Sequence, residues 1–402
     1  MTTTTVDPFA LVGADDPYPD LARLRRAGPV QWAPDRQVWL VTGYDEARHV
    51  MVDATTFTSE AMAAFVVRPS SYDPQPVPAD QRVVSIIGTD GETHQRLRRI
   101  VNRGFTPARV EPLRRRMREV AAELAPRGNH DAVDIQASYA DVLPAIVIAE
   151  MLGVDRDLQH EFHRWSAAMM VAVFGTPDGA QANEVTACLG AMATWLDQTI
   201  AERQHIDGED LISVLLRAES VDDALTHDEL RTFVFTLMVA GSITTALLIG
   251  NGVLLATRQP DVWTAVTTGA VEVADFVEEL LRYDPPAQIM LRTCSAGTDL
   301  AGNTIEPGST MAVVLGAANH DERAFDQPDR FHPRRRPVAH LAFGYGPHFC
   351  LGAALARLEA TVAFEMLAER VERFELVEPL QRLDSEFFRG PSRLVARTVT
   401  RP

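Results

Sequence analysis

Apolar residues recur at helical spacing along most of the chain. Every third or fourth position is apolar in residues 18–26, 107–124, 138–152, 191–203, 230–256, 270–283 and 352–371, which predicts helices there. Shorter runs rich in β-branched and aromatic residues predict strands within 30–41, 287–294, 310–315 and 393–399. The predicted fold is therefore mainly α with minor β sheets.

The segment 233–256 contains no charged side chain and is long enough to span a membrane. Small and polar residues nevertheless interrupt its middle, namely Gly241, Ser242, Thr244, Thr245, Gly250, Asn251 and Gly252. Neither an aromatic belt nor a basic flank marks its ends. We therefore expect no membrane span here, but a long helix that a large hydrophobic core buries on all sides.

The composition fits one large soluble domain. The 402 residues are 46% hydrophobic and 23% charged, and no linker or repeat divides them, so residues 1–402 are predicted to form a single domain. A net charge of −17 argues against nucleic acid as a partner, because phosphates attract basic surfaces. The start lacks the features of a secretory signal, and three scattered cysteines offer no disulfide framework, so we expect a cytoplasmic location.

The most informative segment is Phe343 to Gly352, which reads Phe-Gly-Tyr-Gly-Pro-His-Phe-Cys-Leu-Gly and leads into the last predicted helix. Its glycines permit backbone angles that other residues avoid, and the helix N-terminus favours a thiolate at Cys350 over a thiol. Such a sulfur can bind a metal or attack an electrophile. The alternative interpretation is a small buried hydrophobe, which we expect for Cys188 and Cys294.

These ten residues fill every position of Phe-Gly-x-Gly-x-His-x-Cys-x-Gly, and in this the sequence resembles the cytochrome P450 family, in its soluble bacterial type. The resemblance implies a single-domain P450 fold and haem b (iron protoporphyrin IX) with Cys350 as the proximal iron ligand. It extends from Asp16-Pro17-Tyr18 to the thiolate helix and implies an oxidoreductase that activates dioxygen.

The central helix carries Ala240-Gly241-Ser242-Ile243-Thr244-Thr245, which matches the family pattern Ala-Gly-x-acid-Thr-Thr except that Ile243 replaces the acid. Thr244 can hydrogen-bond the preceding carbonyls and open the helix for oxygen and water, although ordinary back-bonding is the alternative. Cleavage of dioxygen needs protons that isoleucine does not supply. They would come through Thr244, Ser242, water, the substrate or a residue from elsewhere. Gly241 and Thr245 complete the catalytic candidates in this motif.

The resemblance also assigns structural and cofactor contacts. Glu279 and Arg282 share a helix face, and the family pairs such residues with an arginine, here Arg330, to hold the thiolate loop; a surface salt bridge is the alternative. The expected haem contacts, including those to the propionates, are His94, Arg98, Ala240, Arg292, Phe343, His348 and Gly352. A zinc site is not expected, because no Cys or His pairs show ligand spacing.

Family pattern places an apolar substrate pocket around Ile243, Leu247, Ile289, Met290 and Phe387. Met169, Met170, Phe174 and the loop 62–87 are further candidates, and core packing is the alternative for each residue. A lipophilic or aromatic natural product is the expected substrate class.

Three functions compete at this point. The first is a monooxygenase of bacterial secondary metabolism that delivers protons by an atypical route. The second is an oxidase that couples C–C or C–N bonds, for example in aromatic or cyclic dipeptide substrates, without inserting oxygen. The third is a haem sensor or carrier, against which Thr244 and the complete thiolate loop argue.

Ferredoxin and ferredoxin reductase are the expected partners, because no flavin or iron–sulfur domain is fused to the chain. Clusters of arginine could steer a ferredoxin, with a solvated helix face as the alternative. These clusters are Arg96, Arg98, Arg99 and Arg103, then Arg114, Arg115, Arg116 and Arg118, and finally Arg334, Arg335 and Arg336.

Overall fold

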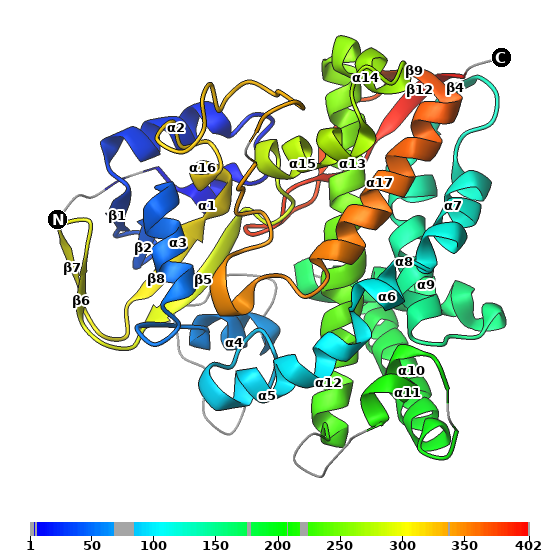
Figure 1. Cartoon of the computed structure of the whole chain (residues 1–402), viewed down its shortest axis with the longest axis horizontal. Helices are drawn as coiled ribbons and strands as arrows, with labels where there is room; N and C mark the ends of the chain where they lie inside the picture. The colour runs from blue at the N-terminus through cyan, green and yellow to red at the C-terminus, as the bar shows by residue number, and fades with distance from the viewer. Residues whose placement is uncertain are drawn as a thin grey trace. The chain divides into compact units, whose positions relative to one another are not determined.

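The structure is a computed structural model that describes residues 4, 6–67, 84–174, 178–206, 208–217, 224–336 and 338–400 (Figure 1). The chain forms two compact units. Unit 1 comprises Met1–Gly91, Gly269–Cys350 and Arg382–Gly390, and unit 2 comprises Glu92–Thr268, Leu351–Gln381 and Pro391–Pro402. Each unit is assembled from separate stretches of sequence. The prediction of a single domain stays a prediction.

Unit 1 is built on a five-stranded sheet of order β1-β2-β8-β5-β3. Its strands are β1 (Val30–Ala33), β2 (Val38–Val41), β3 (Phe57–Thr58), β5 (Ile289–Cys294) and β8 (Thr310–Val314). Its other elements are α1 (Pro8–Leu11), α2 (Tyr18–Ala27), α3 (Tyr44–Val52), α4 (Glu60–Val67), α15 (Val273–Tyr283), α16 (Leu315–Ala318), the hairpin β6 (Thr298–Leu300) and β7 (Asn303–Ile305), and the 3₁₀ turn η7 (Gly346–His348).

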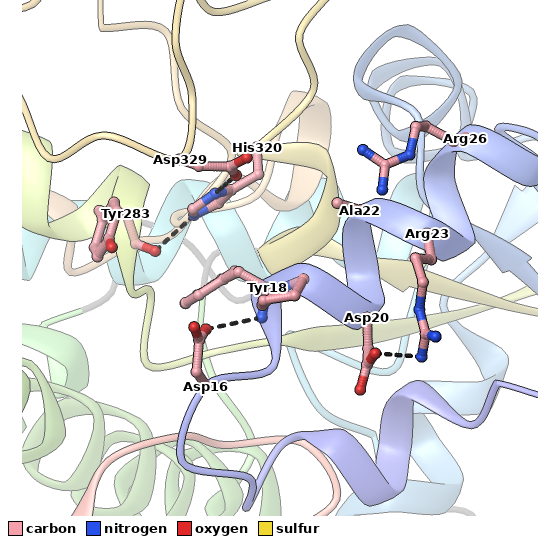
Figure 2. A pocket seen from close by; sticks show the side chains of 10 residues that line it. Asp16, Tyr18, Asp20, Ala22, Arg23, Arg26, Tyr283, His320 and Asp329 are labelled. Carbon is pink, nitrogen blue, oxygen red and sulfur yellow. Dashed lines mark hydrogen bonds and ion pairs between the residues drawn. The ribbon is translucent and has the colours of Figure 1, made fainter.

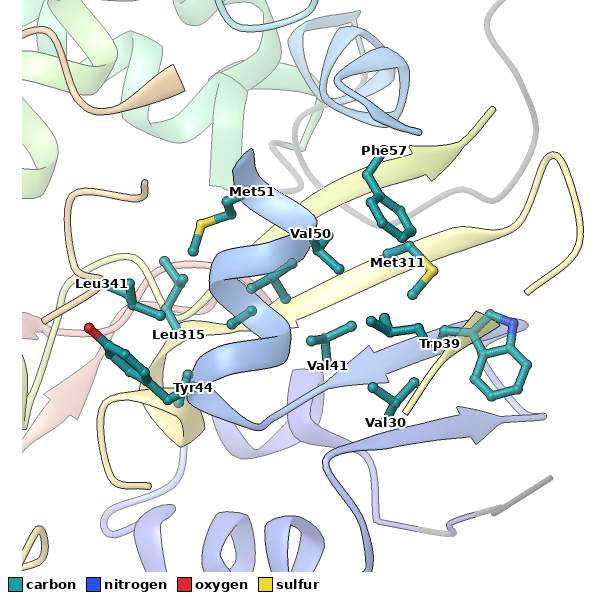
Figure 3. Packing of buried hydrophobic residues seen from close by; sticks show 14 of the residues in the cluster. Val30, Trp39, Val41, Tyr44, Val50, Met51, Phe57, Met311, Leu315 and Leu341 are labelled. Atoms are coloured by element: carbon teal, nitrogen blue, oxygen red, sulfur yellow. The ribbon is translucent and has the colours of Figure 1, made fainter. Parts of the chain in front are cut away.

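Side chains alternate between the two faces of this sheet, as the two-residue period of a strand requires. In β8, Met311 and Val313 pack beneath α3, while Ala312 and Val314 pack in a second core on the opposite face. Figure 3 shows the first of these cores, with Val50 and Met51 of α3 above the sheet. Both faces are therefore buried, which explains why the strands read as continuous apolar runs.

Unit 2 is mainly helical and contains a three-stranded sheet of order β4-β12-β9. Its strands are β4 (His130–Asp134), β9 (Val371–Leu376) and β12 (Val395–Thr400), with β11 (Pro391–Arg393) nearby in sequence and β10 (Gln381–Arg382) at the unit boundary. Its helices are α5 (Gly91–Val101), which begins at the boundary, η2 (Asn102–Gly104), α6 (Pro107–Val110), α7 (Leu113–Leu124), η3 (Gln136–Ala140), α8 (Val142–Met151), η4 (Arg156–Leu158), α9 (Gln159–Phe174), α10 (Gly179–Arg203), α11 (Leu211–Leu216), α12 (His227–Leu237), η6 (Met238–Ile243), α13 (Thr244–Arg258), α14 (Pro260–Thr267) and α17 (Ala353–Arg370).

The predicted central helix is present, and it is continuous from His227 to Arg258 (Figure 1). It begins with a capping box between Thr226 and Glu229, and its middle, Met238–Ile243, is π-helical. By length and composition alone this helix could cross a membrane, but 67% of its most apolar window is buried inside the protein. Burial by protein explains its apolar character.

The predicted mainly α fold with minor sheets is confirmed, and the differences are local. The predicted helix 107–124 is broken between Val110 and Leu113, where Pro112 precedes the second helix as its N-cap. The predicted strand region 30–41 is a hairpin, with β1 and β2 antiparallel. The sequence analysis missed α3, α5 and α9, among others. Charged residues interrupt the apolar positions of α3 and α5, and the first half of α9 is mostly polar or charged.

A buried ion network ties α15 to the chain segment that leads to the thiolate loop, Phe343 to Gly352. The Glu279 and Arg282 side chains are fully buried, and Arg282 donates from Nε and Nη2 to the two carboxylate oxygens of Glu279 at 2.9 and 2.8 Å. Arg282 also donates from Nη1 to the Asn319 carbonyl oxygen at 2.9 Å. Because both charges are removed from water, loss of either side chain would leave the other as an uncompensated buried charge.

Arg335, rather than the predicted Arg330, supplies the second guanidinium of this network. Arg335 is buried, and its Nε lies 3.2 Å from both carboxylate oxygens of Glu279. The Arg330 side chain is exposed, and Arg330 contributes its carbonyl oxygen, which accepts from Arg282 and Arg335. The assignment of Arg330 was wrong because the sequence pattern cannot say which of several nearby arginines turns inward.

Replacing Glu279 with alanine should destabilise the protein by about 3–5 kcal/mol, because two buried guanidinium groups would lose their carboxylate. Denaturant-induced unfolding of the purified protein measures this change. Arg335→Ala should also be strongly destabilising. Arg330→Ala is the matched control and should stay within about 0.5 kcal/mol, because it keeps the carbonyl; equal losses for the two arginine variants would contradict the assignment of Arg335.

Candidate functional site

The thiolate loop of unit 1 presents Cys350 on a constrained backbone. Gly344 and Gly346 have φ angles of +69° and +74°, which favour glycine, and the Cys350 N–H donates to the Phe343 carbonyl oxygen at 2.9 Å. A Cβ at Gly346 would lie 2.8 Å from the main-chain oxygen of Met51 on α3. The loop is therefore packed too closely on α3 to accept a side chain at this position.

Cys350 is the exposed member of the three cysteines, whereas Cys188 and Cys294 are buried and none of them forms a disulfide. Burial raises the pKa of the Cys294 thiol, which keeps it protonated and unreactive. Cys350 lies two positions before Gly352, the N-cap residue of α17. The prediction that Cys350 is the reactive sulfur is consistent with this exposure.

His348, in the same loop, is held by a carboxylate and a hydroxyl. Its Nε2 lies 2.9 Å from Asp90 Oδ1 and 2.9 Å from Ser59 Oγ. The Ser59 N–H donates to the other oxygen of Asp90 at 2.6 Å. Burial raises the pKa of Asp90, but the hydrogen bonds from His348 and Ser59 outweigh it and lower the pKa below its usual value. Asp90 and Ser59 thus orient the imidazole, a role that the sequence analysis missed.

Arg292 provides a buried cation on the α3 face of the sheet, opposite Met311 in the register of β5 and β8. Burial lowers the pKa of its guanidinium, which the charge of Asp90 partly offsets. In the part of the chain that the structure describes, Arg292 has no carboxylate within ion-pair distance, and its Nη1 donates to the Leu291 carbonyl oxygen at 2.7 Å. A buried guanidinium of this kind suits an anionic ligand group.

The motif of residues 240–245 in unit 2 lies in the π-helical turn and the start of α13. The Thr244 hydroxyl donates to the Ala240 carbonyl oxygen at 2.6 Å, and the Thr245 hydroxyl donates to the Gly241 carbonyl oxygen at 3.2 Å. The predicted local opening of this helix is confirmed by its π geometry. Whether Thr244 acts on oxygen stays a prediction.

The neighbours of this turn have distinct environments. A Cβ at Gly241 would lie 2.9 Å from Ile148 Cδ1, so the close approach seen here is to α8. Ser242 is buried, and its hydroxyl has no hydrogen-bond partner among the described residues. Ile243 is buried, whereas Ala240 is exposed. The helix therefore carries the buried Ser242 hydroxyl next to Ile243, the apolar residue at the position where the resembled family has an acid.

The predicted cofactor contacts divide between the units. Phe343, His348 and Arg292 belong to unit 1 together with Cys350. His94, Arg98, Ala240 and Gly352 belong to unit 2. His94 is buried on α5, one helical turn before Arg98.

The predicted pocket residues are packed in cores. Ile289 and Phe387 belong to the sheet core opposite α3, with the partly buried Met290 against it. Ile243 and Leu247 are buried in unit 2. Met169 is buried as well, while the side chains of Met170 and Phe174 and most of the loop 62–87 lie outside the described residues. Packing accounts for these positions, and a role in binding substrate stays a prediction.

Neighbouring carboxylates neutralise the arginine cluster on α7. On α7, Arg114 pairs with Glu111, Arg115 with Glu119, Arg116 with Glu150, and Arg118 with Glu365 and Glu369. In the third cluster Arg335 is buried and Arg336 pairs with Asp275. Charges compensated at this range produce little field beyond about 10 Å, so the α7 cluster is not a strong steering surface.

A surface pocket at α2 contains none of the predicted site residues (Figure 2). The Tyr18 ring stacks on His320 with 4.1 Å between ring centroids, and His320 Nδ1 lies 3.0 Å from Asp329 Oδ1. The Tyr18 hydroxyl donates to Asp284 at 2.6 Å. These polar groups have partners within unit 1, so the arrangement is structural.

The buried carboxyl of Glu359 on α17 also escaped the sequence analysis. Its helix buries Leu355, Leu358, Glu359 and Val362, which follow the i, i+3, i+4, i+7 pattern of one face. That spacing was visible in the sequence and marks Glu359 as the ionisable residue on an apolar face.

Replacing Asp90 with asparagine should destabilise the protein by about 1–2 kcal/mol at neutral pH, because the charge-assisted hydrogen bonds weaken. Since folding lowers the pKa of Asp90, its stabilising effect is present above the usual value of 3.8 and is lost in more acidic solution. The difference from wild type should therefore shrink as the pH falls, which unfolding curves at several pH values measure. Asp35→Asn, at an exposed position, is the control; a constant difference across pH would contradict the prediction.

Comparisons with known proteins agree with this arrangement. The profile of the cytochrome P450 family matches residues 30–395. The cytochrome P450 monooxygenase PikC of Streptomyces venezuelae is 38% identical over 377 residues, which cover 89% of this chain and 84% of PikC. The 6-deoxyerythronolide B hydroxylase of Saccharopolyspora erythraea is 35% identical, with 90% of each chain covered. The structure of cytochrome P450 CYP109Q5 from Chondromyces apiculatus matches with a TM-score of 0.85 at 33% identity and 98% coverage of both chains. The chain belongs to the cytochrome P450 family, whose members are oxidoreductases that use haem b.

Proposed function

We propose that this enzyme is a haem-thiolate monooxygenase that oxidises a lipophilic or aromatic natural product in bacterial secondary metabolism, by hydroxylation or a related oxidation. The observation that carries the proposal is the exposed Cys350 on its constrained loop, in a chain of the P450 family. The relatives named as a monooxygenase and a hydroxylase favour oxygen insertion.

The residues of unit 1 fit a haem with two propionates. Cys350 Sγ would be the iron ligand, and the buried Arg292 guanidinium and the oriented His348 imidazole would bind propionate. The bound haem supplies the binding and reductive activation of dioxygen. From unit 2, His94 and Arg98 are the further candidates for propionate contacts, and Ala240 and Gly352 for contacts with the ring.

Proton supply is the step that this chain handles differently. Thr244 holds its hydroxyl proton toward the Ala240 carbonyl and can exchange it with water at the opened turn. Ser242 is the other hydroxyl in this turn, and Ile243 offers no proton. The proton for oxygen activation would therefore pass through hydroxyls and water, with its source on another element.

Oxidative coupling without oxygen insertion is the second candidate function. Ile243, in place of the usual acid, favours this second candidate. A changed proton supply can change which reaction the activated oxygen carries out on the substrate. Turnover under isotopically labelled dioxygen separates the two candidates: label in the product supports the monooxygenase, and coupled product without label supports the oxidase.

Electrons would come from a ferredoxin and its reductase, and the enzyme would act in the cytoplasm, whose reducing conditions suit its three free cysteines. The α7 arginines are paired with glutamates and therefore do not themselves indicate a docking surface for an acidic ferredoxin. The proposed redox partner rests on membership of the family. Reconstitution with purified ferredoxin and reductase tests it against a flavodoxin as the alternative donor.

Replacing Cys350 with serine should abolish the red-shifted Soret band that the reduced enzyme forms with carbon monoxide, because that band requires a thiolate ligand. Absorption spectra before and after carbon monoxide measure it. Cys188→Ser is the matched control and should keep the band, because Cys188 is buried in α10. A band retained in the Cys350 variant would rule out this sulfur as the ligand.

Replacing Ile243 with aspartate should accelerate oxygen activation about tenfold, because a carboxyl in the π-helical turn Met238–Ile243 would act as a general acid. Stopped-flow decay of the oxygenated enzyme and its solvent isotope effect measure the change. Ile243→Asn is the control of similar size and polarity without an acidic proton. Equal rates in the two variants would contradict the account of this position.

A further inference from the structure

The segment Arg382–Gly390 of unit 1 forms a turn that pairs with the chain just before β5. The Gln288 N–H donates to the Phe387 carbonyl oxygen at 2.8 Å. Ala287 and Phe388 face each other in an isolated antiparallel β-bridge. A bridge of this kind holds one edge of the turn, so the orientation of the turn depends on side-chain contacts.

The buried guanidinium of Arg389 anchors this turn to the N-terminal segment. The Arg389 side chain is 2% exposed. Its Nη1 donates to the Val12 and Ala14 carbonyl oxygens at 2.8 and 2.6 Å, and its Nη2 donates to that of Asp15 at 3.0 Å. Its Nε donates to Asp284 Oδ1 at 2.8 Å. Because a guanidinium carries its donors in a rigid planar fork, these contacts set the direction of the turn as well as its distance from the N-terminal segment.

Tyr18 of α2 reinforces this anchor. Its hydroxyl also donates to Asp284 Oδ1, at 2.6 Å, and the Arg389 guanidinium lies 5.9 Å from the centre of the Tyr18 ring. Burial, followed by the charge of Asp284, raises the Tyr18 pKa well above its usual value, so the hydroxyl keeps its proton and stays a donor. The anchor is therefore a buried, charge-assisted network that a change of side chain would displace.

A second and weaker connection joins the same two parts of the chain. The Phe9 and Phe387 rings meet edge to face with their centroids 5.8 Å apart. Arg36 lies over the Phe9 ring and pairs with Glu386 of the turn at 2.7 Å. Both of these charged side chains are partly exposed, and ion pairs open to water contribute little. Arg389 is therefore the stronger of the two anchors.

The turn contributes to an apolar surface that is partly open to solvent. Phe387 is buried in the core on the sheet face opposite α3. Partly buried side chains from α4, the chain before α5, β5 and the turn pack against this core, and we call four of them the apolar wall: Ala61, Ile87, Met290 and Phe388. Such a surface suits a lipophilic ligand, and the pocket predicted from the family includes Met290. The shape of the apolar wall depends on where Phe388 lies.

We propose that Arg389 determines substrate specificity by positioning: it holds the turn on residues 12–15 and Asp284, and thereby sets where Phe388 lies in the apolar wall. The proposal rests on the proposed function, whose lipophilic substrate would contact this wall. Arg389 acts through Phe388 and is a positioning residue. The N-terminal segment, more than 300 positions before Cys350 in the sequence, is thus part of what selects the substrate.

The shape of the apolar wall can be tested in the holoenzyme without turnover. Imidazole and clotrimazole both bind ferric haem through an imidazole nitrogen and shift its Soret band, but only clotrimazole carries three aromatic rings that extend away from the iron. Arg389→Lys keeps the charge and loses the fork, so it should weaken binding of clotrimazole on the order of tenfold and leave that of imidazole unchanged. Arg23→Lys, at an exposed arginine of α2 that pairs with Asp20, is the matched control and should change neither affinity.

A double-mutant cycle tests whether the effect passes through Phe388. Phe388→Ala should itself weaken binding of clotrimazole, because the apolar wall loses a ring. In the double variant Phe388→Ala, Arg389→Lys the two losses should not add, since the second change no longer has a ring to displace. Fully additive losses would overturn the proposal.

The outcomes separate this proposal from the proposed function. If Arg389→Lys weakens both probes alike, loses the red-shifted Soret band with carbon monoxide, or binds clotrimazole as wild type does, the proposal is overturned. If wild type binds both probes but turnover under labelled dioxygen leaves no label in the product, the monooxygenase proposal fails, and the ratio of the two affinities still decides on Arg389. Should Arg389→Lys not fold, Tyr18→Phe weakens the same anchor and should lower the affinity for clotrimazole selectively; an unchanged ratio in that variant would overturn the proposal.

Discussion

The bidentate contact between Glu279 and the two guanidinium groups of Arg282 and Arg335 is the constraint on which the thiolate site depends. Its carboxylate also accepts the His332 N–H at 2.9 Å, and Arg282 holds the Asn319 carbonyl oxygen. The Asn319 side chain in turn accepts the Leu341 N–H at 2.7 Å, just before the thiolate loop. A long stretch with little regular structure is thereby held by buried, charge-assisted hydrogen bonds, which give it the rigidity that its own backbone lacks.

The loop receives its second support from α3 and the sheet of unit 1. Gly346 packs on the main chain at Met51, and Met51 is part of the core that α3 forms with β2 and β8. Asp90 and Ser59 then fix the His348 ring next to the cysteine. The position of one sulfur and one imidazole thus follows from a hydrophobic core, a glycine contact and a carboxylate that come from distant parts of the sequence.

Unit 2 contributes a different kind of constraint, because it buries polar atoms in an apolar helix bundle. The Ser242 hydroxyl and both Glu359 oxygens lack hydrogen-bond partners among the described residues, although each is nearly inaccessible to solvent. Low polarity around such groups keeps a carboxylic acid neutral and makes each hydrogen bond that it can form stronger. Burial accordingly raises the pKa of the Glu359 carboxyl to about 8.

The sequence by itself determined the mainly α fold and the buried central helix with its opened turn, and it predicts Cys350 as the reactive sulfur. These features depend on local spacing, which a single chain displays directly as periodicity, glycine placement and a ten-residue motif. Only the tertiary structure decided that Arg335 turns inward instead of Arg330, that Asp90 orients His348, and that the α7 arginines are neutralised. These outcomes depend on which side chains meet across segments far apart in the chain. Burial and charge pairing arise only where such side chains come together, and spacing along the sequence does not encode those contacts.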